Sequence, residues 1–295
     1  MEVFYQKLKI IESHIVPKLN TPIRLQEYGV NIFNTLPSKS GLKKAIKKNL
    51  VQVNGEIATT ALYIKGGETI ELFQTTELPK AIQKLNFPLK VVFEDDYLAV
   101  IEKPPGVLVS GNTFVTIYNA LPQNLKKSTQ EDSVRPTPIH RLDYPTSGLV
   151  LIGKTSTSIR ALYKLFEDKK IQKTYYAITI GKMNPKGTIE LTLEEKEAIT
   201  HYKIKETVIS ERFDFLNLVK LEPVTGRRHQ LRKHLFSINN PILGDKDYYI
   251  NGKLLKGKGL YLHAKNLEFI HPITKEKLTI TSELPKKFKK IFPNH

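Results

Sequence analysis

One segment constrains the fold and the chemistry of this chain more than any other: PTPIHRLDYPTSGLVLIGKT, from Pro136 to Thr155. A strand-like approach ends in HRLD, the turn-forming residues YPTSG follow, and the apolar run LVLI predicts a strand that re-enters the core. This pattern fixes Asp143 at the edge of a sheet. A carboxylate held there beside a cation suits a nucleophile or a base, provided that its site is partly desolvated. The same pattern also allows an Asx-type turn in which Asp143 caps the backbone near Thr146.

The region from residue 88 onward mixes two kinds of hydrophobic pattern. Strand-like runs such as LKVVFEDDYLAVIEK, GLVLIGK and KTYYAITIG are interrupted by helical stretches such as SIRALYKLFEDKK. The pattern predicts an α+β catalytic domain over residues 88–295, with a long loop at residues 110–135 and a short basic helix in SELPKKFKKIF. No apolar run is long enough to span a bilayer, and MEVFYQKLKIIESHIV lacks a signal-peptide core. We therefore expect no membrane association and a cytoplasmic location.

A smaller and more basic pattern precedes that region. KSGLKKAIKKNL, residues 39–50, predicts a helix with one apolar face and one cationic face. The cationic face consists of four lysines: Lys43, Lys44, Lys47 and Lys48. Asn54-Gly55 then predicts a two-residue β-hairpin, because both positions tolerate positive φ. We expect a small domain at residues 1–74 and a linker at residues 75–87, whose proline and weak periodicity suit a connection. A lysine-rich helix face can also be simply a solvated surface.

The charge balance and the absence of cysteine narrow the classes of function. Lysine and arginine number 46 against 29 acidic residues, and the formal net charge of +17 suits a polyanion held by phosphate neutralisation. Solubility, or the lysine-rich codon usage of an AT-rich genome, would give the same balance. The chain has no cysteine, which excludes disulfides, thiolate nucleophiles and cysteine-ligated zinc.

Four motifs in a fixed order carry a resemblance to a known family. HRLDYPTSG is preceded by EDDYLAVIEKPPGVLV and followed by KTYYAITIG, and the fourth motif is VTGRRHQLRKH together with the PILGDKDY that comes after it. Together they span residues 94–248 and resemble the RluA-like pseudouridine synthases, which modify uridines of ribosomal and transfer RNA. Residues 21–74 resemble the small RNA-binding domain named after ribosomal protein S-four, through the basic helix, the VNG hairpin and the GGETIEL strand.

The resemblance implies a fold and a set of site residues. The fold would be a mixed, largely antiparallel central sheet flanked by helices and loops, preceded by a small α/β RNA-binding domain. The catalytic residues would be Asp143, Tyr175 and Arg232, with Arg232 paired to Asp143. Substrate binding would involve Arg141, which fills the gap left by a flipped uridine, and His140, Arg227 and His229, together with Lys43, Lys44, Lys47 and Lys48. Arg227 and His229 could instead only satisfy backbone carbonyls of a tight turn.

The expected activity is isomerisation of uridine to pseudouridine in RNA, with large-subunit ribosomal RNA as the substrate. The reaction consumes no electrons, phosphate or water, so we expect no cofactor and no metal. We also expect a monomer. Three alternatives remain open. The substrate could be transfer RNA, or the chain could be a non-catalytic RNA-binding factor in ribosome assembly. The third is a metal-dependent nuclease using Glu94, Asp95 and Asp96, although acids in a turn usually face solvent.

Overall fold

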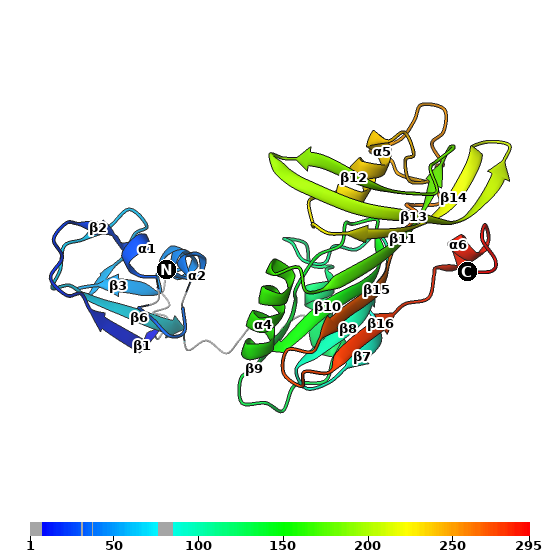
Figure 1. The fold of residues 1–295 in the computed structure, drawn as a ribbon. Helices are drawn as coiled ribbons and strands as arrows, with labels where there is room; N and C mark the ends of the chain where they lie inside the picture. Colours follow the sequence, from blue (N-terminus) through cyan, green and yellow to red (C-terminus); the bar gives the residue numbers. More distant parts are fainter. Residues whose placement is uncertain (1–7, 31, 37, 76–84) are drawn as a thin grey trace, which may run out of the picture. The chain divides into compact units, whose positions relative to one another are not determined.

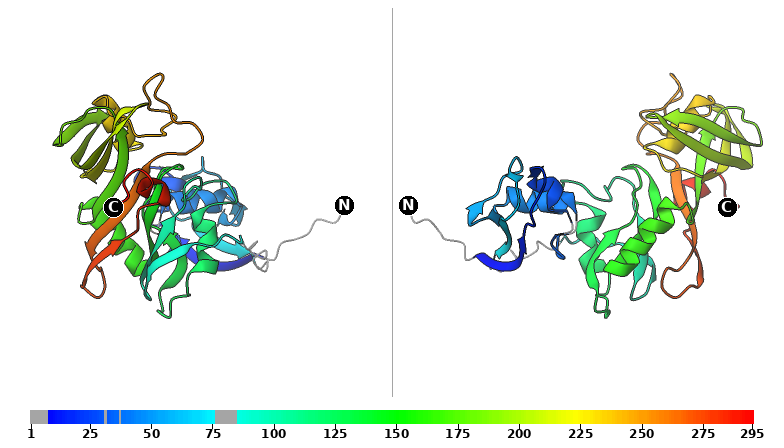
Figure 2. Two further views of the ribbon diagram at one scale, coloured as in Figure 1. Left: turned by 90° about the vertical axis from the view of Figure 1, so that its right-hand side faces the viewer. Right: turned by 60° about the vertical axis from the view of Figure 1, so that its left-hand side comes forward.

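The computed structural model describes residues 8–30, 32–36, 38–75 and 85–295. The chain divides into two compact units, residues 1–83 and residues 84–295, and each is described by itself (Figures 1 and 2). Most of the linker expected at residues 75–87 lies outside the described residues. No helix among those described is both long and apolar enough to span a bilayer.

The first unit packs short strands against two helices. In chain order its elements are β1 (Leu8–Ile15), β2 (Ile23–Arg24), α1 (Leu25–Tyr28), α2 (Lys39–Lys47), β3 (Val51–Val53), β4 (Glu56–Ile57), β5 (Tyr63–Ile64) and β6 (Thr69–Thr75). Four strands form an antiparallel sheet in the order β1-β6-β3-β4, and β2 pairs with β5.

The helix and the hairpin predicted in this unit are both present. Helix α2 begins after Ser38, whose side chain accepts a hydrogen bond from the backbone N–H of Gly41, and it buries its apolar face in the core of the unit. Its lysines lie on the outer side. Asn54 and Gly55, with φ of 51° and 82°, connect β3 to β4, as the hairpin requires.

The second unit is built on one large sheet. Its elements are β7 (Lys90–Glu94), β8 (Leu98–Lys103), α3 (Ile117–Asn124), β9 (Ser133–Pro138), β10 (Ser147–Thr155), α4 (Ser156–Glu167), β11 (Gln172–Ile180), β12 (Lys186–Leu193), β13 (Lys196–Ser210), β14 (Asp214–Pro223), α5 (Gln230–Ser237), β15 (Leu262–Ile270), β16 (Lys277–Thr281) and α6 (Lys286–Lys289). The ten-stranded sheet runs β12-β13-β14-β11-β15-β10-β8-β7, with β16 on β15 and β9 on β10. The pair β10 and β15 is parallel and the other pairs of this sheet are antiparallel, so the expected mixed, largely antiparallel α+β fold is confirmed.

Strands β8 and β10 are buried on both faces because a helix covers each side. Alternate residues such as Val100 and Leu151 face α4, and their neighbours Ile101 and Val150 face α3. Figure 2 shows α4 running along these strands. The helix α3 corrects the expectation of a continuous loop at residues 110–135. It begins after Thr116, whose side chain caps the helix, but its short length and its internal Pro122 weaken the helical pattern in the sequence.

The other half of the sheet, formed by β11 to β14, packs against α5 and α6. The core between these elements includes Leu231 and Leu235 of α5. It also includes Phe288 of α6 and Phe292, which follows α6. The short basic helix predicted near the C-terminus is α6.

The two halves of the sheet meet at one very close backbone contact. Gly148 of β10 lies opposite Ala264 of β15, and Ala264 in turn lies opposite Tyr175 of β11. A Cβ atom added at Gly148 would lie 2.3 Å from the carbonyl oxygen of Ala264, and Gly148 has a φ of 119°, which L side chains rarely adopt. Glycine is therefore required at this position.

We predict that Gly148→Ala lowers the free energy of unfolding of the second unit by about 3 kcal/mol or more, because backbone strain and overcrowding add. Urea unfolding monitored by circular dichroism would measure this. Gly226→Ala is the matched control, since an added Cβ there meets no atom within 4 Å. A change at Gly148 as small as that at Gly226 would contradict the role of the close contact.

Candidate active site

Asp143 lies in the turn between β9 and β10. Its backbone carbonyl accepts a hydrogen bond of 3.0 Å from the N–H of Thr146, which closes the turn. Its carboxylate accepts no hydrogen bond from any residue that the structure describes, so the side-chain cap considered from the sequence is not formed. The side chain is 21% exposed. A partly buried carboxylate without a hydrogen-bonded partner is available for chemistry.

Lys103 holds this turn through a hydrogen bond to its backbone. Its side chain is fully buried at the end of β8, and its ammonium group donates hydrogen bonds to the carbonyls of Pro104 at 2.9 Å and Tyr144 at 3.2 Å. Burial lowers the pKa of Lys103 to about 8, while the nearby charge of Asp143 acts to raise it. Sequence reasoning missed Lys103. The sequence offered one sign of its role: Lys103 precedes two prolines in EDDYLAVIEKPPGVLV, one of the motifs that carry the family resemblance.

Strand β11 contributes Tyr175 and Lys173 to the same site. Burial raises the pKa of the Tyr175 hydroxyl, and the charge of Asp143 raises it further, so the phenol stays protonated at neutral pH. Burial lowers the pKa of Lys173. Because residues two apart on a strand share one face, the lysine-x-tyrosine motif places both side chains toward the site. Lys173 was not among the site residues expected from the sequence.

The loop between β14 and α5 forms the opposite wall and is held by Gln230. The side-chain oxygen of Gln230 accepts hydrogen bonds from the hydroxyl of Thr225 at 2.7 Å and the backbone N–H of Arg227 at 3.0 Å. Its amide nitrogen donates to β13, at the carbonyl of Ile199. Arg227 donates through Nε to the carbonyl of Glu197 at 3.1 Å, so it does satisfy a backbone carbonyl while it also lines the site.

His229 contacts Asp143 from this wall. Its Nε2 lies 3.9 Å from Oδ1 of Asp143, and its Nδ1 lies 3.2 Å from the hydroxyl of Tyr248. Burial lowers the pKa of His229 and Asp143 opposes that effect, with a net lowering. His229 has a φ of 55°, a left-handed conformation that costs energy for a residue with a side chain. Such strain is typical of functional positions.

Arg232 does not form the expected ion pair with Asp143. Arg232 lies in α5 and is buried. Its guanidinium donates hydrogen bonds to both carboxylate oxygens of Asp245, at 2.7 and 2.6 Å, and to one oxygen of Asp247 at 2.7 Å. Burial lowers the pKa of Arg232, but these hydrogen bonds outweigh burial and raise it. The planar fork of arginine matches one carboxylate, and here the fully buried Asp245 occupies it. The charge of Asp143 reaches Arg232 only at longer range.

His140 does not line the cavity, contrary to its expected role in substrate binding. Its Nε2 accepts a hydrogen bond of 3.0 Å from the N–H of Leu151, and its ring lies 4.9 Å from that of Phe166. Burial, followed by the charge of Lys173, lowers the pKa of His140 to about 3, so the ring is neutral. His140 therefore anchors the approach to the turn against β10 and α4.

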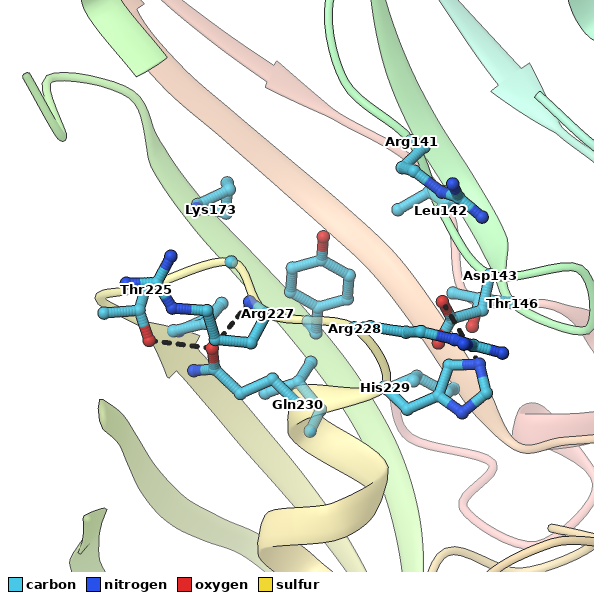
Figure 3. Close-up of a pocket in the computed structure, with 15 residues that line it drawn as sticks. Arg141, Leu142, Asp143, Thr146, Lys173, Thr225, Arg227, Arg228, His229 and Gln230 are labelled. Carbon is cyan, nitrogen blue, oxygen red and sulfur yellow. Dashed lines mark hydrogen bonds and ion pairs between the residues drawn. The ribbon is translucent and has the colours of Figure 1, made fainter. Parts of the chain in front are cut away.

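These side chains surround a cavity of about 230 Å³. Five cationic or ionisable basic residues line it together with Asp143 and Tyr175: Arg141, Lys173, Arg227, Arg228 and His229. Figure 3 shows Arg141 and Asp143 on one side, Arg227 on the other, and Arg228 and His229 extending toward Asp143. An anionic substrate would be attracted to this cavity, and one carboxylate would face its reacting atoms.

The acidic run at residues 94–96 is engaged elsewhere. Glu94 binds the ammonium group of Lys154 at 2.8 Å, Asp95 lies 3.0 Å from the ring of His271, and Asp96 accepts hydrogen bonds from the backbone and side chain of Thr129. Among the described residues no group of three or more potential ligands could hold a metal ion.

Comparison with known proteins identifies the family of the chain. Residues 97–237 match the family described as RNA pseudouridylate synthase. A protein of Aquifex aeolicus named "Uncharacterized RNA pseudouridine synthase" is 32% identical over 86% of this chain and 88% of its own length. The chain belongs to the RNA pseudouridylate synthase family.

Further relatives agree with this assignment. The "Ribosomal large subunit pseudouridine synthase D" of Buchnera aphidicola is 35% identical, with 86% of this chain and 88% of that protein covered. The solved structure of "Human RNA Pseudouridylate Synthase Domain Containing 4" is 26% identical and superposes with a TM-score of 0.55 over 68% of this chain and 90% of that chain. The chain is an RNA pseudouridine synthase, an isomerase that breaks the bond from uracil N1 to the ribose and rejoins the base through C5.

In this synthase we predict that Arg232→Gln lowers the free energy of unfolding by about 3–5 kcal/mol, because it leaves the buried charge of Asp245 without its cationic partner. Thermal unfolding would detect the loss. Adding Asp245→Asn to the variant should restore part of it, since the two residues act as a pair.

The neighbouring Lys233→Gln is the control. Lys233 pairs with the exposed Glu194 at 3.5 Å, and such pairs contribute about 1 kcal/mol or less. Equal effects of the variants at positions 232 and 233 would contradict the structural role of the Arg232 pair.

Proposed function

We propose that this synthase isomerises uridines of large-subunit ribosomal RNA, with Asp143 as the catalytic group. The observation that carries the proposal is the carboxylate of Asp143, which accepts no hydrogen bond from the part of the chain that the structure describes and faces a cavity whose other charged side chains are basic. The substrate class is supported by relatives named as ribosomal large subunit pseudouridine synthases, at 29–35% identity.

Asp143 would start the reaction at the ribose of the target uridine. Attack on the anomeric carbon and removal of a ribose proton both begin with the ionised carboxylate, and both release the base from its N1 bond. The base then turns, C5 bonds to the anomeric carbon, and C5 loses its proton while N1 gains one. Tyr175, protonated and beside Asp143, would lie against the base and relay the C5 proton: its oxygen would accept that proton as it passes its own to the Asp143 carboxylate, which is free again once C5 has bonded to the anomeric carbon.

The basic residues of the cavity would hold the RNA around the target. Arg141 is exposed at the cavity, which suits the role of filling the position that a flipped uridine leaves in the stack. Lys173, Arg227, Arg228 and His229 would contact the phosphates on either side. Arg232 would act indirectly, by fixing α5 and therefore His229 opposite Asp143.

The first unit would add affinity without reading bases. Lys44, Lys47 and Lys48 are exposed on α2, Lys43 is partly exposed, and none of the four forms an ion pair within the residues described. Such a face suits phosphate groups of folded RNA. We propose that the enzyme acts as a monomer in the cytoplasm, where its RNA substrate is found.

We predict that Asp143→Asn abolishes isomerisation and leaves RNA binding unchanged or slightly tighter. The amide is nearly isosteric but cannot act as a nucleophile or base, and loss of a negative charge does not weaken phosphate contacts. Release of tritium from RNA labelled at uracil C5 measures the reaction, and filter binding measures affinity.

Asp214→Asn is the matched control for this prediction. Asp214 lies at the start of β14 with a φ of 62°, which asparagine also tolerates, and its side chain is 64% exposed. This variant should release tritium like the parent. Release of tritium by the Asp143 variant at the parent's rate would remove Asp143 from the mechanism.

We further predict that changing Lys43, Lys44, Lys47 and Lys48 together to Gln weakens RNA binding and flattens its salt dependence. Each lost phosphate contact should reduce the slope of log K against log salt by about 0.7–0.9. Affinity measured at several salt concentrations gives this slope.

The control is an equal change of charge on the second unit, with Lys164, Lys170, Lys275 and Lys277 changed to Gln. These four side chains are exposed and lie outside the cavity of Asp143. If both quadruple variants had the same slope, the effect would reflect net charge and the α2 face would not bind the RNA.

A further inference from the structure

A second cavity lies on the other side of the turn that carries Asp143. It has a volume of about 530 Å³, within the range of roughly 300–1,000 Å³ that is usual for small-ligand sites. Tyr144 and Pro145 line it, whereas the preceding Asp143 lines the first cavity. His229 lines both cavities. The two hollows are therefore neighbours, separated by the turn and by one imidazole.

The aromatic ring of Tyr144 is exposed, and hydrogen bonds hold the backbone that carries it. The residue is 57% exposed, which is high for an aromatic side chain in a folded unit. Its carbonyl accepts hydrogen bonds from the N–H of Gly106 at 2.8 Å and from the ammonium group of Lys103. A Cβ atom added at Gly106 would lie 4.0 Å from the Tyr144 hydroxyl, so the side chain extends over this glycine.

The remaining lining combines proline rings and glycine backbone with charged side chains. Gly244 and Gly259 present backbone without side chains, next to the proline rings of the cavity wall. Lys246 and Asp247 lie at the polar edge, and Asp247 is 61% exposed although it is paired with Arg232. A planar ligand with apolar faces and hydrogen-bonding edges matches this arrangement, and a nucleobase has that chemistry.

We propose that this second cavity binds the nucleobase adjacent to the target uridine, stacked on Tyr144. The inference rests on the proposed function, because it takes the first cavity as the site of the target nucleotide. Asp143 then faces the target uridine, and Tyr144, the next residue of the turn, faces the neighbouring nucleotide. The stack between the two bases is opened, and each base enters its own cavity on one side of the turn.

The test is a cycle that combines a protein variant with an RNA variant. The probe is a stem-loop fragment of large-subunit ribosomal RNA, selected by its binding to the parent protein and labelled with tritium at uracil C5. Two further versions carry an abasic nucleotide either directly before or directly after the target uridine. Affinities of the parent and of Tyr144→Ala are measured for all three RNAs.

We expect Tyr144→Ala to weaken binding of the intact RNA about tenfold, in line with loss of one base–aromatic stack. For one of the two abasic RNAs the parent should bind about tenfold more weakly, and Tyr144→Ala should then cause no further loss. Non-additivity of this kind shows that the tyrosine and that base contact each other. Tyr144→Phe, which keeps the ring, should restore the affinity for the intact RNA.

Tyr163→Ala controls for the loss of an exposed tyrosine. Tyr163 is 47% exposed on α4 and lines neither cavity, so its variant should bind all three RNAs like the parent. Additive effects of Tyr144→Ala with both abasic RNAs would overturn the proposal, as would equal effects at positions 144 and 163. Tritium release by the parent is read separately, and its absence would reject the proposed function whatever the binding cycle shows.

Discussion

The short parallel contact between β10 and β15 is the constraint on which the rest of the catalytic unit depends. It joins the half of the sheet that carries α3 and α4 to the half that carries α5 and α6. At this contact Gly148, Ala264 and Tyr175 lie in one row across three strands. The turn of Asp143 precedes Gly148 directly, so the register that closes the sheet also brings Asp143 close to Tyr175.

Around this contact the buried cations have hydrogen-bonded partners, whereas the carboxylate of Asp143 has none among the described residues. Lys103 donates to carbonyl oxygens of the turn, and Arg232 is neutralised by Asp245 and Asp247. These hydrogen bonds offset the cost of removing charge from water and rigidify the turn and α5. Asp143 lies between these two supports without a hydrogen bond of its own among the described residues. The surrounding structure is thus fixed before substrate arrives, and the carboxylate proposed to react is left available.

Sequence patterns predicted the features that depend on neighbouring residues. The hairpin at Asn54-Gly55, helix α2 and the strand that follows the Asp143 turn all come from local periodicity and turn chemistry. Helix α3 was not predicted, because eight residues with an internal proline give little periodicity. The α+β class was predicted from the alternation of strand-like and helical runs, and the family through the order of the four motifs, which no single motif would have supported.

Features that depend on contacts distant in the sequence were harder to predict. The family pattern marked Arg232 but could not show which of several carboxylates would occupy its guanidinium, and Asp245 does. His140 was marked by its place beside Arg141, yet alternation along an extended chain turns neighbouring side chains to opposite sides. Lys103 gave no signal of burial, because lysine is rarely buried and its contact with the Asp143 turn joins residues 41 positions apart in the sequence.

The size of the Asp143 cavity sets a condition on how RNA can react there. A space of about 230 Å³ can receive a single nucleobase but not a stacked helix, so the target uridine must leave its stack. Unstacking costs a few kcal/mol, and Asp143 cannot offset this cost because its negative charge repels phosphate. The basic residues of the cavity would offset the cost of unstacking, by neutralising phosphates on either side of the extruded base. In the proposed mechanism, binding and chemistry are therefore carried by different residues: the cations would hold the RNA open, and the Asp143 carboxylate would act on the exposed nucleoside.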